Sequence, residues 1–190
     1  TITGGKSEFY NEKQKSWVDL DDQGGRIQFL DNKTGFVLNS DATGWNHLYF
    51  YDMKGKLVNA ITSGKFTVTN VNYIDEKKGV VYFMARSLEN TARNDFYRVN
   101  VNGKNMERLT IGEYNNSINL SPDGSYFVVT SNNTGTPTKM TLMSTKRKII
   151  KIYTTQSAAN GFLYINMHLY ESIKWANVIL ISKEPRTTGN

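Results

Sequence analysis

Few residues in this 190-residue sequence could carry acid–base or nucleophilic chemistry. The histidines are His47 and His168, and the absence of cysteine excludes a thiolate nucleophile, a thiolate metal site and a disulfide. A serine nucleophile on a strand-to-helix elbow needs Gly-x-Ser-x-Gly, and no two glycines here lie four residues apart. Two isolated histidines also argue against a zinc site. We therefore predict no catalytic, cofactor-binding or metal-binding residues and no cofactor.

The titratable residues that remain have ordinary structural interpretations. His47 lies in a predicted strand, and Asp95 takes its place in a second copy of the same unit, so we expect a structural role. His168 alternates with apolar residues, as on the polar face of a strand. The acidic pairs Asp21-Asp22 and Asp75-Glu76 fall in predicted turns, where solvated carboxylates are expected.

The net charge of +6 is not spread along the chain. Residues 1–138 carry 15 basic and 15 acidic residues, whereas residues 139–190 carry 8 basic and 2 acidic ones. The one basic cluster, Lys146-Arg147-Lys148 with Lys151, could contact nucleic acid, but a charged edge strand is the commoner cause. We therefore expect no nucleic-acid partner.

Tripeptides that begin at Asn32, Asn115 and Asn132 match the acceptor pattern for N-glycosylation, which matters only in a secreted eukaryotic protein. No apolar run approaches the length of a membrane span. The chain has neither an initiator methionine nor an apolar leader, so we expect it to begin inside a longer protein or after processing.

The sequence predicts repeated pairs of strands around these residues. Residues 47–64 align without a gap with residues 95–112, at a constant offset of 48 residues (47 to 95). The alignment matches Gly55 with Gly103, and Gly55 suits the positive φ of a tight hairpin. A strand-built repeat of about 40 to 50 residues is typical of propeller blades.

Short strands are predicted throughout the rest of the chain, and nothing in residues 17–144 requires a long helix. They cover residues 17–20, 26–30, 35–40, 66–73, 80–85, 118–120, 125–131, 138–144, 149–153 and 163–170. Residues 173–181 fit a strand or a helix. The predicted fold class is all-β: a partial β-propeller of about three blades, each an antiparallel four-stranded sheet, with an unassigned C-terminal tail.

The predicted domain division follows the repeat. Residues 1–144 form the partial propeller, with blade repeats near 35–86 and 87–131 and a third copy starting at 138. Residues 145–190 contain the last strand and the basic tail. Three blades cannot close a ring, so we expect exposed edge strands that pair with a second copy of the chain or are covered by the tail.

Several segments, taken together, resemble a known family in their order and spacing. They are Trp17-Val18-Asp19, Gly44 to Tyr49, Ile61 to Gly64, Val68, Asp75, Val81 to Phe83, Tyr97 to Val99, Arg108 to Thr110 and Ser121 to Gly124. Over roughly residues 15–144 the chain resembles the dipeptidyl peptidase IV family of prolyl-oligopeptidase-like serine peptidases. The resemblance implies a piece of an N-terminal β-propeller that gates and supports an α/β-hydrolase domain, which removes N-terminal dipeptides from peptides.

The resemblance also implies where the chemistry of such a protein would lie. The serine, aspartate and histidine of the hydrolase domain would follow this chain, and a pair of glutamates that holds the substrate amine would precede it. No Glu-Glu pair occurs here, so no family site residue is carried over. The parent would be a periplasmic or extracellular hydrolase acting on peptides. The alternative is a stand-alone propeller-type module that binds peptides or polysaccharides.

Overall fold

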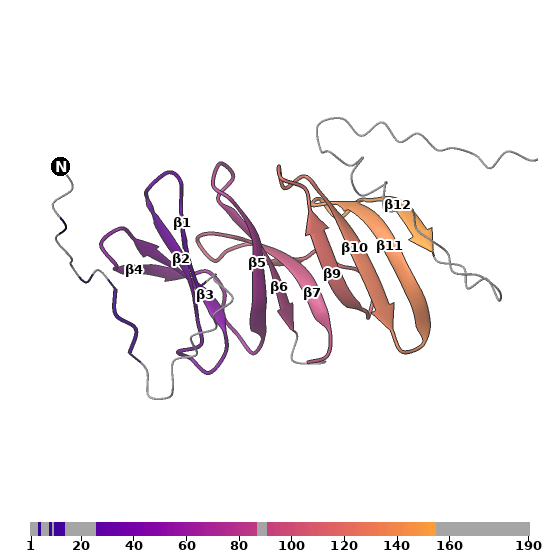
Figure 1. The fold of residues 1–190 in the computed structure, drawn as a ribbon, viewed down its shortest axis with the longest axis horizontal. Coiled ribbons are helices and arrows are strands. Elements are labelled where there is room, and N and C mark those ends of the chain that lie inside the picture. The colour runs from indigo at the N-terminus through magenta and orange to yellow at the C-terminus, as the bar shows by residue number, and fades with distance from the viewer. Residues whose placement is uncertain (1–3, 5–7, 9, 14–25, 87–90, 155–190) are drawn as a thin grey trace, which may run out of the picture. The chain divides into compact units, whose positions relative to one another are not determined.

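The computed structural model describes residues 4, 8, 10–13, 26–86 and 91–154. Within these residues the chain forms twelve strands and no helix. The strands form three four-stranded antiparallel sheets, which lie side by side in chain order (Figure 1). The predicted all-β fold with about three four-stranded blades is confirmed.

Each sheet consists of four strands that follow one another in sequence and pair with their chain neighbours. Sheet A contains β1 (Ile27–Phe29), β2 (Gly35–Ser40), β3 (His47–Asp52) and β4 (Leu57–Ala60). Sheet B contains β5 (Thr67–Asp75), β6 (Val80–Arg86), β7 (Asn94–Asn100) and β8 (Glu107–Arg108). Sheet C contains β9 (Asn115–Leu120), β10 (Tyr126–Asn133), β11 (Thr136–Ser144) and β12 (Ile149–Thr154). Such an open four-stranded meander is the form of a propeller blade.

The repeated sequence unit forms the last two strands of two successive sheets. Residues 47–64 contain β3 and β4, and residues 95–112 contain most of β7 and all of β8. The turn glycines Gly55 and Gly103 have φ of 77° and 79°, as the hairpin prediction requires. The three sheets begin at residues 27, 67 and 115. The predicted blade repeats near 35–86 and 87–131 and the division of the chain at residue 144 stay predictions.

One local expectation needs correction. Asp75 does not lie in a solvated turn, because it is the last residue of β5 and only 5% exposed. Two register shifts interrupt the pairing of β5 with β6. Pro137 lies in β11, next to a register shift where no ladder donor is needed.

Other predictions fall outside the described residues. These are the strands at 17–20 and 163–170, the segment 173–181, the pair Asp21-Asp22 and His168. In β6, every side chain from Val81 to Ala85 is buried, so both faces of this strand are covered.

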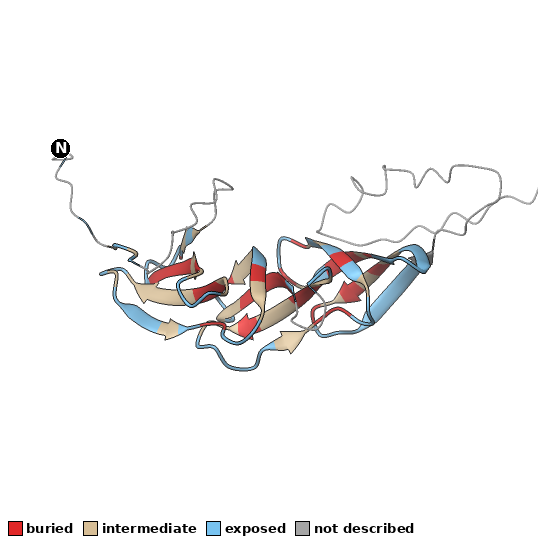
Figure 2. Ribbon diagram, turned by 90° about the horizontal axis from the view of Figure 1, so that it is seen from below, coloured by how far each residue is buried: buried red, intermediate tan, exposed pale blue. Residues whose placement is uncertain are grey.

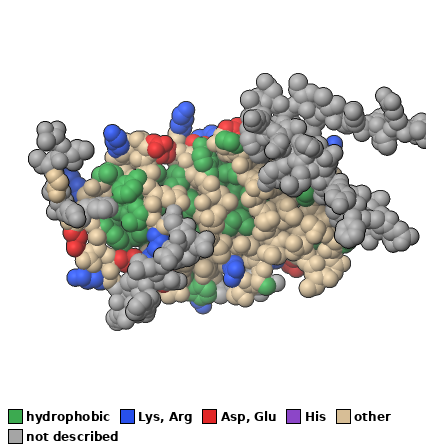
Figure 3. Space-filling model, in the orientation of Figure 1, with side chains coloured by type: hydrophobic (Ala, Val, Ile, Leu, Met, Phe, Trp, Pro, Cys, Tyr) green, Lys and Arg blue, Asp and Glu red, His purple; other side chains and the backbone are tan. Residues whose placement is uncertain are grey.

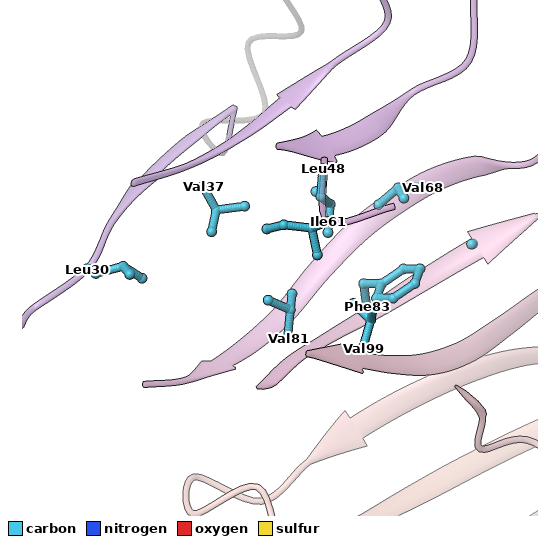
Figure 4. Packing of buried hydrophobic residues seen from close by; sticks show 9 residues of the cluster. Leu30, Val37, Leu48, Ile61, Val68, Val81, Phe83 and Val99 are labelled. Carbon is cyan, nitrogen blue, oxygen red and sulfur yellow. The ribbon is translucent and has the colours of Figure 1, made fainter. Parts of the chain in front are cut away.

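Two hydrophobic clusters hold neighbouring sheets together, and the buried residues lie mainly in the strands (Figure 2). The first joins sheets A and B and contains Leu30, Val37, Leu48, Ile61, Val68, Val81, Phe83, Ala85 and Val99 (Figure 4). The second joins sheets B and C and contains Tyr82, Met84, Phe96, Leu109, Phe127, Val129 and Met143. Because β6 supplies alternate residues to both clusters, sheet B is buried on both faces.

Candidate functional site

His47, the first residue of β3, is 3% exposed and bonded through both ring nitrogens. Nε2 lies 2.9 Å from the carbonyl oxygen of Gly64, which can only accept, so Nε2 carries the proton. Nδ1, 3.2 Å away from Thr62 Oγ1, then accepts the hydroxyl hydrogen. Burial lowers the pKa of His47, and the bond to Gly64 only partly offsets this effect. This neutral imidazole fastens the chain after β4 to β3, as the structural interpretation predicted.

Asp95 stands at the corresponding position of sheet B and is fully buried. Its Oδ1 accepts a 2.7 Å hydrogen bond from Thr110 Oγ1, the counterpart of Thr62. Arg93 Nε lies 3.0 Å from Oδ2, and Arg108 Nη2 lies 3.0 Å from Oδ1. Two guanidinium groups thus flank one buried carboxylate.

The Asp95 cluster continues into sheet C. Asn116 Nδ2 donates to Asp95 Oδ1 at 3.1 Å and to the carbonyl oxygen of Asn94 at 2.9 Å. Ser131 Oγ in turn donates to Asn116 Oδ1 at 2.8 Å. A polar chain therefore crosses from β7 through β9 to β10 and fixes the loops at that end of sheets B and C.

Those loops line a half-open pocket of about 430 Å³. Three short segments line it: residues 92–93 before β7, residues 113–115 between β8 and β9, and residues 132–134 at the β10–β11 turn. A volume of this size lies in the range of small-molecule sites. The side chains around it are polar or charged apart from Ala92 and the ring of Tyr114.

Sequence reasoning did not find this pocket. Its signal was present as the Asn-Asn pairs at 115–116 and 132–133, which matched only the glycosylation pattern. The structure places Asn115 and Asn132 opposite each other as cross-strand partners of β9 and β10, and both line the pocket. Sequence spacing did not reveal the pocket because its third segment, residues 92–93, precedes β7 of sheet B and meets them only where sheets B and C pack together.

The other predicted residues have structural partners. Glu76 accepts the backbone N–H groups of Asp31 and Asn32 at 2.6 and 3.0 Å, which ties a turn of sheet B to one of sheet A. Burial raises the pKa of Asp75, but hydrogen bonds from Lys78 outweigh it and hold that pKa below its usual value. The basic cluster is exposed in the turn before β12, where Arg147 lies 3.6 Å from Glu107.

In the ranges 26–86 and 91–154, with the few described residues near the N-terminus, no three acidic or imidazole side chains gather to hold a metal ion. No helix in that part of the chain is long and apolar enough to cross a membrane.

The sheets and their spacing define a class of protein built from propeller blades. Residues 2–138 match the sequence model of the family described as the dipeptidyl peptidase IV (DPP IV) N-terminal region. The chain belongs to this family, and the resemblance drawn from the sequence is confirmed.

Individual relatives agree with the family match. The chain is 29% identical over 147 residues to dipeptidyl peptidase 4 of Arthroderma otae, covering 75% of this chain and 19% of the relative. It is 30% identical over 148 residues to probable dipeptidyl peptidase 4 of Arthroderma benhamiae, covering 75% and 18%. The chain thus spans about a fifth of the length of these relatives.

Solved structures show the same fold. The crystal structure of Porphyromonas gingivalis dipeptidyl peptidase 4 superposes with a TM-score of 0.68 at 26% identity, over 79% of this chain and 21% of that one. A putative dipeptidyl aminopeptidase IV from Bacteroides ovatus gives a TM-score of 0.60 at 23% identity, over 72% and 22%. The second likeness supports the fold alone.

Proposed function

We propose that this chain is a three-blade part of the N-terminal propeller of a dipeptidyl peptidase IV-like serine exopeptidase. In this proposal it is non-catalytic and supports and gates an α/β-hydrolase domain elsewhere in the parent, which removes dipeptides from peptide N-termini. The parent acts in the periplasm or outside the cell.

The observation that supports the proposal is that the family sequence match and the blade-like sheets cover the same part of the chain. The family match covers residues 2–138, and all of sheets A and B lies within that range. His47 and Asp95 make the same contact in these two sheets, which marks them as copies of one structural unit. The side-chain bonds of both residues are used within the fold, which supports a scaffolding role.

Cleavage of a Gly-Pro-linked chromogenic amide tests the proposal. We expect release of the chromophore by the longer parent protein and none by the 190-residue chain alone. Activity of the isolated chain would show that it is itself catalytic. Inactivity of both proteins would favour the alternative, a propeller-type binding module.

We further propose that exposed blade edges pair with a second copy of the chain. β4 is an edge strand of sheet A, and its Leu57 and Val58 are 48% and 55% exposed. Figure 3 shows hydrophobic side chains gathered over sheet A. Exposed apolar edges favour strand pairing. Light scattering across a concentration series should give a mass that rises toward a dimer, and a constant monomer mass would exclude this pairing.

A further inference from the structure

The pocket between sheets B and C is lined by asparagine side chains, two of whose amide oxygens already accept hydrogen bonds from the protein. Asn115 Oδ1 accepts the backbone N–H of Asn94 at 3.2 Å. Asn133 Oδ1 accepts the backbone N–H of Gly135 at 3.0 Å and the hydroxyl of Thr136. Asn133 Nδ2 donates one hydrogen to the carbonyl oxygen of Glu113 at 3.4 Å. Because both amide oxygens accept hydrogen bonds from the protein, the Asn115 NH₂ group and the second hydrogen of the Asn133 NH₂ group are the donors that remain.

Arg93, a charged residue that lines the pocket, also has hydrogen-bond donors. Arg93 is 11% exposed, and its Nε is held by the buried carboxylate of Asp95 at 3.0 Å. That bond restrains the guanidinium group, and its Nη1 lies 3.9 Å from Glu113, which also lines the pocket. Glu113 is 92% exposed, so solvent screens its charge strongly.

The surrounding charges favour an anion. Arg93 and Arg108 share the single carboxylate of Asp95, which leaves one excess positive charge beside the pocket. Lys139 Nζ lies 4.1 Å from the ring centre of Tyr114, so a third cation stands next to the pocket wall. Glu113 opposes these charges only from its solvated position.

We propose that this pocket binds a carboxylate group of a short peptide. A guanidinium edge and amide NH₂ groups together match the two oxygens of a carboxylate, to which arginine presents parallel donors. The pocket volume of about 430 Å³ accommodates a few residues. The carboxylate preference rests on the pocket alone. The peptide nature of the ligand rests on the proposed function. A C-terminus and an acidic side chain supply the same chemistry.

Peptide titrations of the full 190-residue chain, labelled with ¹⁵N and followed by NMR, test the proposal. The probes are Gly-Pro-Ala with a free carboxylate, Gly-Pro-Ala amide, and Gly-Glu-Ala amide. We expect saturable shifts of the Asn94, Asn115 and Gly135 amide signals with the free acid and binding at least about tenfold weaker with Gly-Pro-Ala amide. Binding of Gly-Glu-Ala amide would assign the site to acidic side chains as well as C-termini.

Asn115→Asp is the decisive variant. It keeps the oxygen that accepts the Asn94 N–H and replaces the NH₂ donor by an anionic oxygen of the same size. We expect it to weaken binding of the free acid at least about tenfold, because attraction becomes repulsion. Asn102→Asp is the matched control, since Asn102 Oδ1 accepts the Lys104 N–H at 3.0 Å in the exposed β7–β8 turn.

Three results would overturn the proposal: equal binding of the acid and the amide, unchanged binding by Asn115→Asp, or shifts confined to residues away from the pocket. Saturable binding of succinate without binding of any peptide would refute the peptide assignment. None of these readouts needs peptidase activity. A parent that fails to cleave the Gly-Pro amide would therefore count against the proposed function and leave the carboxylate test intact.

Discussion

His47 and Asp95 occupy the same place in two successive sheets and reach the same partner, a threonine fifteen residues further along the chain. In both cases the threonine hydroxyl donates to the side chain at the start of the third strand. That hydroxyl oxygen also accepts a backbone N–H, from Leu48 at 2.9 Å in sheet A and from Phe96 at 3.3 Å in sheet B. A neutral imidazole in sheet A and a carboxylate between two arginines in sheet B thus bind the threonine hydroxyl in the same way.

The imidazole should make the stability of the chain depend on pH. Burial holds the pKa of His47 below its ordinary value of 6.5, so the unfolded chain binds a proton more readily than the folded chain. The contribution of His47 is therefore complete above pH 6.5 and is lost as the pH falls through its lower, folded-state pKa. Denaturant unfolding between pH 7.5 and 5 should show this loss.

Substituting the two histidines separately assigns the effect. His47→Gln should flatten the pH dependence in that window, whereas His168→Gln should preserve it. A slope that survives in His47→Gln would contradict the assignment. The carboxylates of Asp75 and Asp123 have pKa values below 3.8, so their loss of stabilisation occurs at lower pH and does not overlap.

Removing the charge of Asp95 should be among the most costly single changes. Asp95→Asn leaves Arg93 and Arg108 without their shared carboxylate in a buried site, and we expect a loss of about 3 kcal/mol in the free energy of unfolding. Glu113→Gln removes a carboxylate that is 92% exposed and should cost less than about 0.5 kcal/mol. Equal losses in the two variants would disprove the central role of Asp95. Urea denaturation measures both.

Alanine substitutions at two turn glycines test how closely sheets A and B pack against each other. Gly79 has φ of 64° and open space around it, so Gly79→Ala should cost only the conformational penalty of about 1 kcal/mol. Gly103 has φ of 79°, and an added Cβ would lie 2.7 Å from the carbonyl oxygen of Ala60. Gly103→Ala should therefore cost about 2 kcal/mol more. Similar unfolding midpoints for the two variants would mean that the sheets separate easily at this contact.

Glu76 provides a local probe of the same pair of sheets. Its carboxylate accepts two backbone N–H groups, those of Asp31 and Asn32. Glu76→Gln leaves one oxygen to accept them, and we expect a loss of about 1 kcal/mol. Hydrogen exchange should accelerate at the Asp31 and Asn32 amides and stay unchanged at Lys78, whose N–H is bonded to Asp75. Uniform acceleration would indicate a general loss of stability instead.

The sequence predicted those features of the fold that depend on neighbours along the chain. Period-two alternation, β-branched residues and turn glycines located most of the described strands within a few residues. The 48-residue offset (47 to 95) related β3 to β7 and β4 to β8 before their pairing was known. These signals succeed because strand pairing in a meander joins consecutive segments, so local pattern and local geometry coincide.

Exposure and side-chain contacts between sheets were predicted less well. Asp75 belongs by sequence to a polar, turn-like run, yet it ends a strand and is buried beside Lys78. Glu76, next to it, binds a turn more than forty residues earlier. The polar character of these residues indicated solvent, whereas the structure uses their carboxylates to satisfy backbone donors.

The sequence by itself determined that the chain is a strand-built repeat of the dipeptidyl peptidase IV family, because blade patterns and family motifs are properties of residue order. Only the tertiary structure brought Arg93, just before β7, beside Asn115 of β9 and joined Asp95 to Asn116 across sheets B and C. Those contacts depend on how one sheet stacks on the next. Stacking is set by the combined packing of two apolar clusters, which no single stretch of sequence encodes.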